Sequence, residues 1–407
     1  MTVRDSWWRR SVTGKKDNIV LAMLALVVIG FETGAQWLPS EQNTEVRGFL
    51  GGMPIYSFSF DPDEQFLDYL IHSRLDFTYF LPVVPVTLHG AVRLQVFWGE
   101  QAEAFGLESP VVDIIGEDRG IMDLTGAWGG ITVLNMDRLY LSYSRPSLRV
   151  TVGRQRVNWG TNYVWNPNDW FNAYEYLDFD YEERPGSDAL RVQYYPGVLS
   201  LFEAALGASE HREERVYALL YRFNRFNYDL QFQGGFFGLD AAGGFSWSGS
   251  IGGAGFRGEL STYLPFLSED DGVDIGDELT TVTAISGDYM FANGLHVIGE
   301  ALYNGFGDNG IVDTVPLLSP QINAKNLTPA RFLLYSSVSY PFVPLLQGAL
   351  SVMFNPDDQS LLLQPSLDWS VATNLDLLTI AQLYIGDDGT VFGQLPNLLA
   401  ARLRYYF

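Results

Sequence analysis

The chain lacks cysteine altogether and has few basic residues among its 407 positions. The missing thiols exclude structural disulfides, thiolate metal sites and cysteine nucleophiles. Lys and Arg number 25 against 48 Asp and Glu, which gives a formal net charge of −23. So acidic a chain is a poor partner for nucleic acid, because nucleic-acid binding depends on cations that neutralise phosphates.

Long apolar runs are also missing beyond the N-terminus. No stretch of 18 consecutive apolar residues occurs after residue 35, so the sequence offers no transmembrane helix there. The run Ile19–Gly30 is too short to span a bilayer, and it follows a basic stretch and precedes Thr33-Gly34-Ala35. This pattern predicts a cleavable signal peptide over residues 1–35, with Gln36 as the new N-terminus. An uncleaved N-terminal anchor is the alternative.

Glycine and aromatic residues are abundant instead. The chain has 41 Gly, 22 Tyr, 27 Phe and 10 Trp, and only 18% of its residues are charged. Aromatic residues favour strands, whereas so much glycine is unfavourable in helices. A transmembrane barrel accounts for both facts, since half of each strand faces lipid and half faces water. We therefore expect an all-β fold, a single transmembrane antiparallel β-barrel over residues 36–407, in the outer membrane of a Gram-negative-type bacterium.

Alternation with a period of two is the main local signal. Between residues 86 and 98, Thr87, His89, Arg93 and Gln95 share one face, and the other face is apolar. Alternation alone also fits a soluble sandwich with one buried face. The number of such segments, without helical patterns between them, favours a barrel.

Short turns and long acidic connections follow one another regularly, as in barrels with short periplasmic turns and long external loops. We expect about 18 strands, or 16 if the two weakest, 44–52 and 241–249, are absent. The expected strands are 44–52, 66–80, 85–99, 131–144, 147–159, 188–196, 199–209, 214–224, 226–237, 241–249, 251–263, 279–291, 293–304, 329–340, 345–354, 359–371, 374–385 and 396–407.

The last strand ends in an aromatic residue. Apolar side chains alternate up to the C-terminus, and Arg402, Arg404 and Tyr406 fall on the opposite face. This ending resembles the signal read by the outer-membrane barrel assembly machinery, which we expect as a partner along with outer-membrane lipid. The residues of this assembly signal are Leu399, Ala401, Leu403, Tyr405 and Phe407.

A motif follows in the middle of the chain, at Gly153-Arg154-Gln155 and Trp159-Gly160. With the stretches WNPND (165–169) and DFDYEERPGSD (178–188), it resembles porin-like outer-membrane barrels that carry a GRQ-x-x-x-WG strand. These include alginate-export-like and related uncharacterised barrels. The resemblance covers about 50 residues, and it implies a barrel more directly than a channel.

Arginines on these strands raise a question of orientation. Strict alternation puts Arg154 and Arg156 on the lipid face, where each costs about 2–4 kcal/mol near mid-membrane. We expect a bulge near Gly153 that turns both into the lumen. Alternatively, they lie beyond the apolar band. Together with lumenal arginines on neighbouring strands they form the expected pore-lining row Arg74, Arg93, Arg138, Arg154 and Arg156.

A long acidic connection, residues 160–187, follows this strand. It carries Asp178, Asp180, Glu182 and Glu183. Folded inward, it would set carboxylates opposite the arginine row and create a narrow polar constriction, which tunes selectivity. The same residues also fit ion pairs that only hold the connection in place, or a plugged barrel.

Other chemistry-bearing residues give weaker signals. His72 and His89 share the lumenal face of neighbouring strands, as a metal or catalytic pair or, more simply, as lining residues. The acidic stretch 268–277 fits a Ca²⁺ ligand set or a solvated loop. Without a Ser-His-Asp set we expect no enzyme, and no catalytic residue, metal or cofactor.

The expected function is a passive channel for small hydrophilic solutes. The alternative is a non-conducting barrel that serves as a structural or assembly partner. The alternation places few bulky apolar residues in the lumenal rows, which favours water inside.

Overall fold

The computed structural model describes residues 43–59, 65–100, 125–128, 132–172, 186–267, 278–307 and 323–407. The expected signal peptide, residues 1–35, lies outside this part of the chain. Residues 46–407 form one compact unit. Within the described ranges, no helix is long and apolar enough to cross a membrane.

Nineteen strands make up nearly all of the described structure, because alternating aromatic and β-branched residues suit a pleated surface. One short 3₁₀ helix, η3 (Arg212–Glu214), interrupts them. The strands are β1 (Thr44–Phe58), β2 (Gln65–Phe80), β3 (Val86–Gly99), β4 (Thr125–Trp128), β5 (Thr132–Arg145), β6 (Leu148–Gln155), β7 (Ser187–Gly197), β8 (Ser200–Gly207), β9 (Val216–Arg225), β10 (Tyr228–Phe237), β11 (Asp240–Ile251), β12 (Ala254–Pro265), β13 (Thr280–Met290), β14 (His296–Asn304), β15 (Phe332–Val343), β16 (Leu346–Phe354), β17 (Leu361–Ala372), β18 (Leu375–Ile385) and β19 (Asn397–Tyr406).

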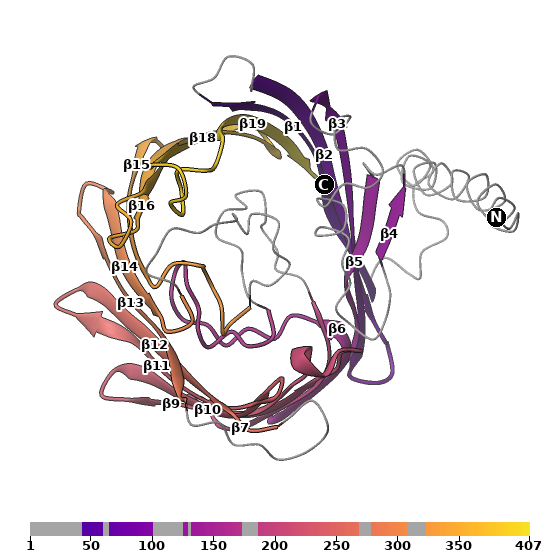
Figure 1. The fold of residues 1–407 in the computed structure, drawn as a ribbon. Coiled ribbons are helices and arrows are strands. Elements are labelled where there is room, and N and C mark those ends of the chain that lie inside the picture. Colours follow the sequence, from indigo (N-terminus) through magenta and orange to yellow (C-terminus); the bar gives the residue numbers. More distant parts are fainter. Residues whose placement is uncertain are drawn as a thin grey trace, which may run out of the picture. The chain divides into compact units, whose positions relative to one another are not determined.

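The sheet closes on itself (Figure 1). Neighbouring strands are antiparallel, and β19 pairs with β1 through Phe49 and Tyr406. The short β4 lies beside residues 132–135 of β5, whose other edge bonds β3, so β4 adds no strand to the ring. Eighteen strands therefore form a closed antiparallel barrel. The expected architecture is confirmed, including both of the strands with the weakest sequence signal.

Tight turns join the strands at one end. Phe226 and Asn227 between β9 and β10 both have positive φ, at 57° and 62°. Gly252 and Gly253 between β11 and β12 follow the same pattern, with φ of 59° and 89°. Two consecutive positive φ values are the signature of the two-residue hairpin turn whose twist matches that of the strands.

Side chains alternate between the lumen and an exposed outer surface. On β9, Ala218 and Leu220 are buried inside, whereas Tyr217, Leu219 and Tyr221 are exposed. An outward band of large apolar side chains is what a lipid-facing barrel surface requires.

The C-terminal residue completes the ring. Backbone bonds join Gly48 N to Phe407 O at 3.1 Å and Phe407 N to Gly48 O at 3.0 Å. A Cβ at position 48 would lie 2.7 Å from the Phe407 ring, so the ring occupies space that Gly48 leaves empty. The Leu399–Phe407 face is directed outward, while Arg404 on the opposite face is fully buried.

An apolar core fills part of the lumen. It contains Trp165 and Trp170 after β6, Leu327 before β15 and Phe392 before β19, together with inward side chains of β7–β17. Leu302, Leu333 and Leu362 are among these inward side chains, and each is at most 2% exposed. The expectation that lumenal rows hold few bulky apolar residues is therefore wrong for this side of the barrel.

Candidate functional site

The chain turns off the barrel wall at the end of β6. Gly153 has a φ of +113°, and a Cβ at this position would lie 2.3 Å from the Leu139 carbonyl oxygen. Glycine alone tolerates both conditions. The next two residues, Arg154 and Gln155, are both buried, although they follow each other in the chain.

Arg154 and Gln155 hold this turn in place. Arg154 donates to Asp188 of β7 from Nε at 2.9 Å and from Nη2 at 3.1 Å, a bidentate pair between two buried side chains. Gln155 Nε2 donates to the Ala189 carbonyl at 2.9 Å. The GRQ residues thus anchor the chain where it leaves the wall.

The expected bulge near Gly153 is absent from the strand ladder. β6 pairs with β5 and β7 in continuous register through Gly153 and Arg154. The bulge lies in the neighbouring β5, where the register with β3 shifts so that Asp137 and Arg138 are both buried. In β5 the extra residue Asp137 brings Arg138 to the lumenal face, whereas in β6 the positive φ of Gly153 leaves both Arg154 and Gln155 buried.

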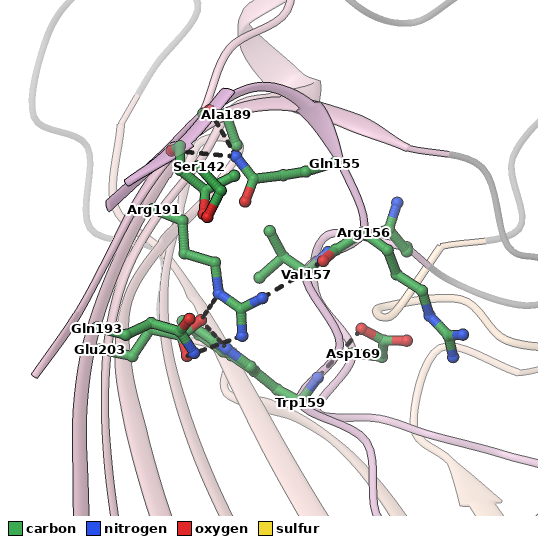
Figure 2. A network of polar contacts seen from close by, with 12 residues as sticks. Ser142, Gln155, Arg156, Val157, Trp159, Asp169, Ala189, Arg191, Gln193 and Glu203 are labelled. Carbon is green, nitrogen blue, oxygen red and sulfur yellow. Dashed lines mark hydrogen bonds and ion pairs between the residues drawn. The ribbon is translucent and has the colours of Figure 1, made fainter. Parts of the chain in front are cut away.

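The residues that follow, 156–172, form what we call the inward segment, which crosses the interior of the ring (Figure 1). Arg191 Nη1 of β7 donates to the Arg156 carbonyl at 3.5 Å, and Trp159 Nε1 donates to Glu203 of β8 at 2.8 Å. Glu203 also accepts from Arg191 Nη2 and from Gln193 Nε2, each at 2.9 Å. Figure 2 shows these side chains converging on Glu203, with Arg156 directed away from them.

Glu259 of β12 binds the backbone of the inward segment. Its Oε1 accepts from the backbone N–H of Thr161 and, at 2.8 Å, from that of Asn162. Its Oε2 accepts from Asn168 N at 2.9 Å. One buried carboxylate therefore satisfies three main-chain donors, which would otherwise be costly inside the barrel.

Glu300 of β14 repeats the arrangement on the next stretch. Its Oε2 accepts from Tyr163 N at 3.1 Å and Val164 N at 3.0 Å, and its Oε1 accepts from Trp165 N at 2.7 Å. Charge-assisted bonds to backbone N–H groups are stronger than neutral ones. Glu259 and Glu300 together thus bind six backbone N–H groups of the inward segment, those of residues 161–165 and 168.

The WNPND stretch supplies the next contacts. Asn168 donates to the Phe245 carbonyl at 3.0 Å, and its Oδ1 accepts from Ser261 Oγ at 2.7 Å. Trp170 Nε1 donates to Ser261 Oγ at 2.9 Å, and Gln233 Nε2 donates to the Asn168 carbonyl at 3.0 Å. These residues fix the inward segment against β10–β12.

A charged cluster adjoins the segment at Tyr163. Asp288 of β13 accepts from His296 Nε2 at 3.2 Å and lies 3.7 Å from Arg257 Nη2. The Arg257 guanidinium stacks over the Tyr163 ring at 4.2 Å. Burial and a hydrogen bond with Asp288 raise the pKa of Tyr163 to about 12, so the phenol stays protonated as a donor.

The expected arginine row is partly an ion-pair cluster. Arg74 and Arg93 lie directly opposite each other on β2 and β3, where like charges repel. Asp137 offsets this, since it pairs with Arg74 and lies 3.4 Å from Arg93 Nη2. Arg138 donates to the Asp137 carbonyl at 2.8 Å. All four side chains are buried.

Other expected site residues have different outcomes. Asp178, Asp180, Glu182 and Glu183 lie outside the described residues, as does the acidic stretch 268–277. His72 and His89 are not brought together, because Gln95 stands opposite His72 and Thr78 stands opposite His89. His89 Nδ1 lies 2.9 Å from Thr78 Oγ1, and His72 packs edge-on against Phe49.

Three glutamates of the wall, Glu203, Glu259 and Glu300, were not among the residues predicted from the sequence. One sequence feature could have identified them. Each is a carboxylate at a lumenal position of its strand, and the paired position of the neighbouring strand carries no Lys or Arg. Such a carboxylate needs donors from elsewhere: backbone N–H groups of the long connection provide them for Glu259 and Glu300, and the side chains of Trp159, Arg191 and Gln193 provide them for Glu203.

No protein-family model and no curated protein matches the sequence. Solved structures do match. OccAB4 of Acinetobacter baumannii is 10% identical, with a TM-score of 0.55, over 91% of this chain and 100% of that one. The outer membrane protein OpdK of Pseudomonas aeruginosa is 11% identical, with a TM-score of 0.53, over 89% and 98%. The likeness shows the fold of porin-like outer-membrane barrels.

Proposed function

We propose that the protein is an outer-membrane channel of the porin type, for passive diffusion of small hydrophilic solutes. The observation that carries this proposal is the inward segment, fixed inside a closed ring by Glu259 and Glu300. A connection held rigidly in the lumen narrows it at a defined place. The polar and charged groups at such a constriction set selectivity.

The outer surface supports a membrane location. A row of neighbouring aromatic rings runs across the exposed face of β8–β12, of the kind that forms a belt at the membrane interface. It consists of Phe202, Tyr221, Phe223, Phe232, Phe245, Trp247 and Phe256. Outer-membrane lipid is the proposed environment. Cleavage after Ala35 is part of this proposal, and N-terminal sequencing of the membrane-extracted protein should begin at Gln36 or within a few residues.

The direct test is conductance of the folded barrel in planar bilayers. Wild-type protein should give discrete single-channel steps, and deletion of residues 165–183 should raise the step size. Heat-modifiable migration serves as the control that each sample is folded. Folded barrels without conductance, both wild type and deletion variant, would refute the channel.

A non-conducting barrel with a structural or assembly role is the second candidate. The apolar core inside the lumen favours it, because a packed interior carries no water. Swelling of liposomes in small sugars separates the two functions: a channel admits the sugar and a plugged barrel does not.

The GRQ-x-x-x-WG resemblance is also a proposal of distant relationship with alginate-export-like barrels. It is supported by the joint role of Gly153, Arg154, Gln155 and Trp159 in turning the chain inward. Transport rather than catalysis is the activity that fits this use of the motif.

A further inference from the structure

The outer wall of the barrel is hollowed on the side opposite the aromatic row of β8–β12. A groove of about 740 Å³ crosses this wall from β15 through β19 to β1. Small side chains face outward along its middle, namely Gly348 of β16, Thr379 and Ala381 of β18 and Ala401 of β19. Larger outward side chains are exposed beside them, namely Leu350, Leu367 and Leu399. We call this hollow the outer groove.

The outer groove runs across the strands, because its residues follow the pairing from one strand to the next. Leu367 stands opposite Gly348 on one side and opposite Thr379 on the other. Five strand spacings of about 4.8 Å separate β15 from β1, so the groove is about 24 Å long. It begins at Phe342, next to the last residue of β15, and reaches Tyr56, close to the opposite end of the wall on β1. The groove therefore climbs obliquely from the short-turn end towards the loop end.

The lining of the outer groove is apolar. None of the described residues that line it is charged. Its surroundings are the exposed apolar side chains that face lipid in a transmembrane barrel. An empty hollow in such a surface forfeits dispersion contacts, whereas an acyl chain lying in it gains contacts from the sides as well as from below. A chain that reaches the middle of a hydrocarbon core of about 30 Å is about 15 Å long, so it fits lengthwise.

The two ends of the outer groove differ in charge. The turn after β15 presents exposed Phe342 and Leu345 among wholly uncharged residues. At the other end, the connection 386–396 exposes Asp387 and Asp388 and contains no Lys or Arg. These carboxylates repel lipid phosphates, whereas an apolar turn is compatible with the edge of a bilayer. A chain therefore enters from the short-turn end, which faces the periplasm in bacterial barrels and meets the phospholipid leaflet.

We propose that the outer groove binds one acyl chain of a glycerophospholipid that enters from the short-turn end. The proposal rests on the membrane location proposed above and is independent of conductance. The bound lipid exchanges with the bilayer more slowly than lipid on the rest of the wall, because its chain must first leave the groove. The seated chain also lies across the junction of β19 with β1, where Leu399 pairs with Tyr56, and so covers the place where the ring closes.

The test fills the outer groove without altering the inner face of the barrel. Ala381→Phe puts a ring at the middle of the groove, and the matched control Ala301→Phe puts the same ring on the exposed face of β14, outside the groove. Each protein is folded in micelles with palmitoyl-oleoyl phosphatidylethanolamine, and native mass spectrometry measures the lipid that stays bound. Wild type and control should retain one phospholipid, and Ala381→Phe should retain it about tenfold less often, a ratio that corresponds to about 1.4 kcal/mol.

Four outcomes of this experiment would overturn the proposal. Equal retention by Ala381→Phe and wild type would mean adventitious lipid only, and equal loss in both variants would mean a general effect of the added ring. Preferential retention of added lipopolysaccharide would assign the groove to the other leaflet. A dimer that Ala381→Phe alone dissociates would make the groove an interface between two copies of this chain.

A second measurement needs no substitution. Phosphatidylethanolamine with a photoreactive diazirine in its acyl chain should label peptides from β17–β19 of the wild-type protein more than peptides from β8–β12. Even labelling around the barrel would also overturn the proposal. Failure of the membrane location itself appears differently, as folded protein that takes no label from bilayers at all.

Discussion

Replacing Glu300 by alanine should release the inward segment while leaving the barrel intact. Glu300 accepts three backbone bonds, from Tyr163, Val164 and Trp165. The strand ladder of β14 with β13 and β15 does not use this side chain. The substitution therefore acts on the segment and not on the ring.

The magnitude follows from the donors left behind. A buried N–H that loses its acceptor costs about 1–3 kcal/mol, and three are affected. Water entering the vacated space satisfies some of them, so we take about 3 kcal/mol for local opening of the segment. Since about 1.4 kcal/mol is tenfold in an equilibrium, the amides of residues 163–165 should exchange roughly 100-fold faster.

Hydrogen exchange followed by mass spectrometry measures this on the folded protein in detergent. Asp368→Ala is the matched control, because Asp368 is an exposed carboxylate on β17. The control should leave exchange at residues 163–165 unchanged, and both variants should keep the heat-modifiable band. Wild-type exchange rates in Glu300→Ala would refute the view that this carboxylate holds the segment.

Three other outcomes are expected. Gly153→Ala should lower the thermal unfolding temperature, because a φ of +113° costs alanine about 1–3 kcal/mol and its Cβ would clash with Leu139. The control Gly52→Ala should leave this temperature unchanged, because no atom lies within 4 Å of a Cβ at position 52. Deletion of Phe407 should reduce the folded, heat-modifiable form in the outer membrane, and normal yield would rule out the proposed assembly signal. Arg156→Glu should shift the reversal potential toward cations, most at 0.01 M salt where the Debye length is about 30 Å; an unchanged potential would remove Arg156 from the pore lining.

Much of the barrel was predictable because its signals are local. Alternation in each strand, the turn residues between strands and the apolar C-terminal face all depend on neighbours in sequence. The expected first strand, 44–52, was nevertheless too short, since β1 continues to Phe58. Pro54 and the small residues around it weaken the alternation signal without ending the strand.

The interior was less predictable because its contacts join distant parts of the chain. Glu259 and Glu300 meet the inward segment across about 90 to 137 positions, and nothing at either place indicates the other. The bulge was expected in β6 because Gly153 marks that strand. The structure has it at Asp137 in β5, where the local sequence carries no glycine.

The anchoring of the inward segment through main-chain amides has an evolutionary consequence. At positions 161–164, Glu259 and Glu300 bind N–H groups that every residue except proline possesses. Side chains here can therefore change without loss of the attachment, whereas proline cannot be accepted. Mutational scanning should find proline rejected at all four positions and the two glutamates intolerant, whereas other substitutions there lose only side-chain contacts, such as those of Asn162 with Ala284 and Ser286, and leave the framework of main-chain bonds in place.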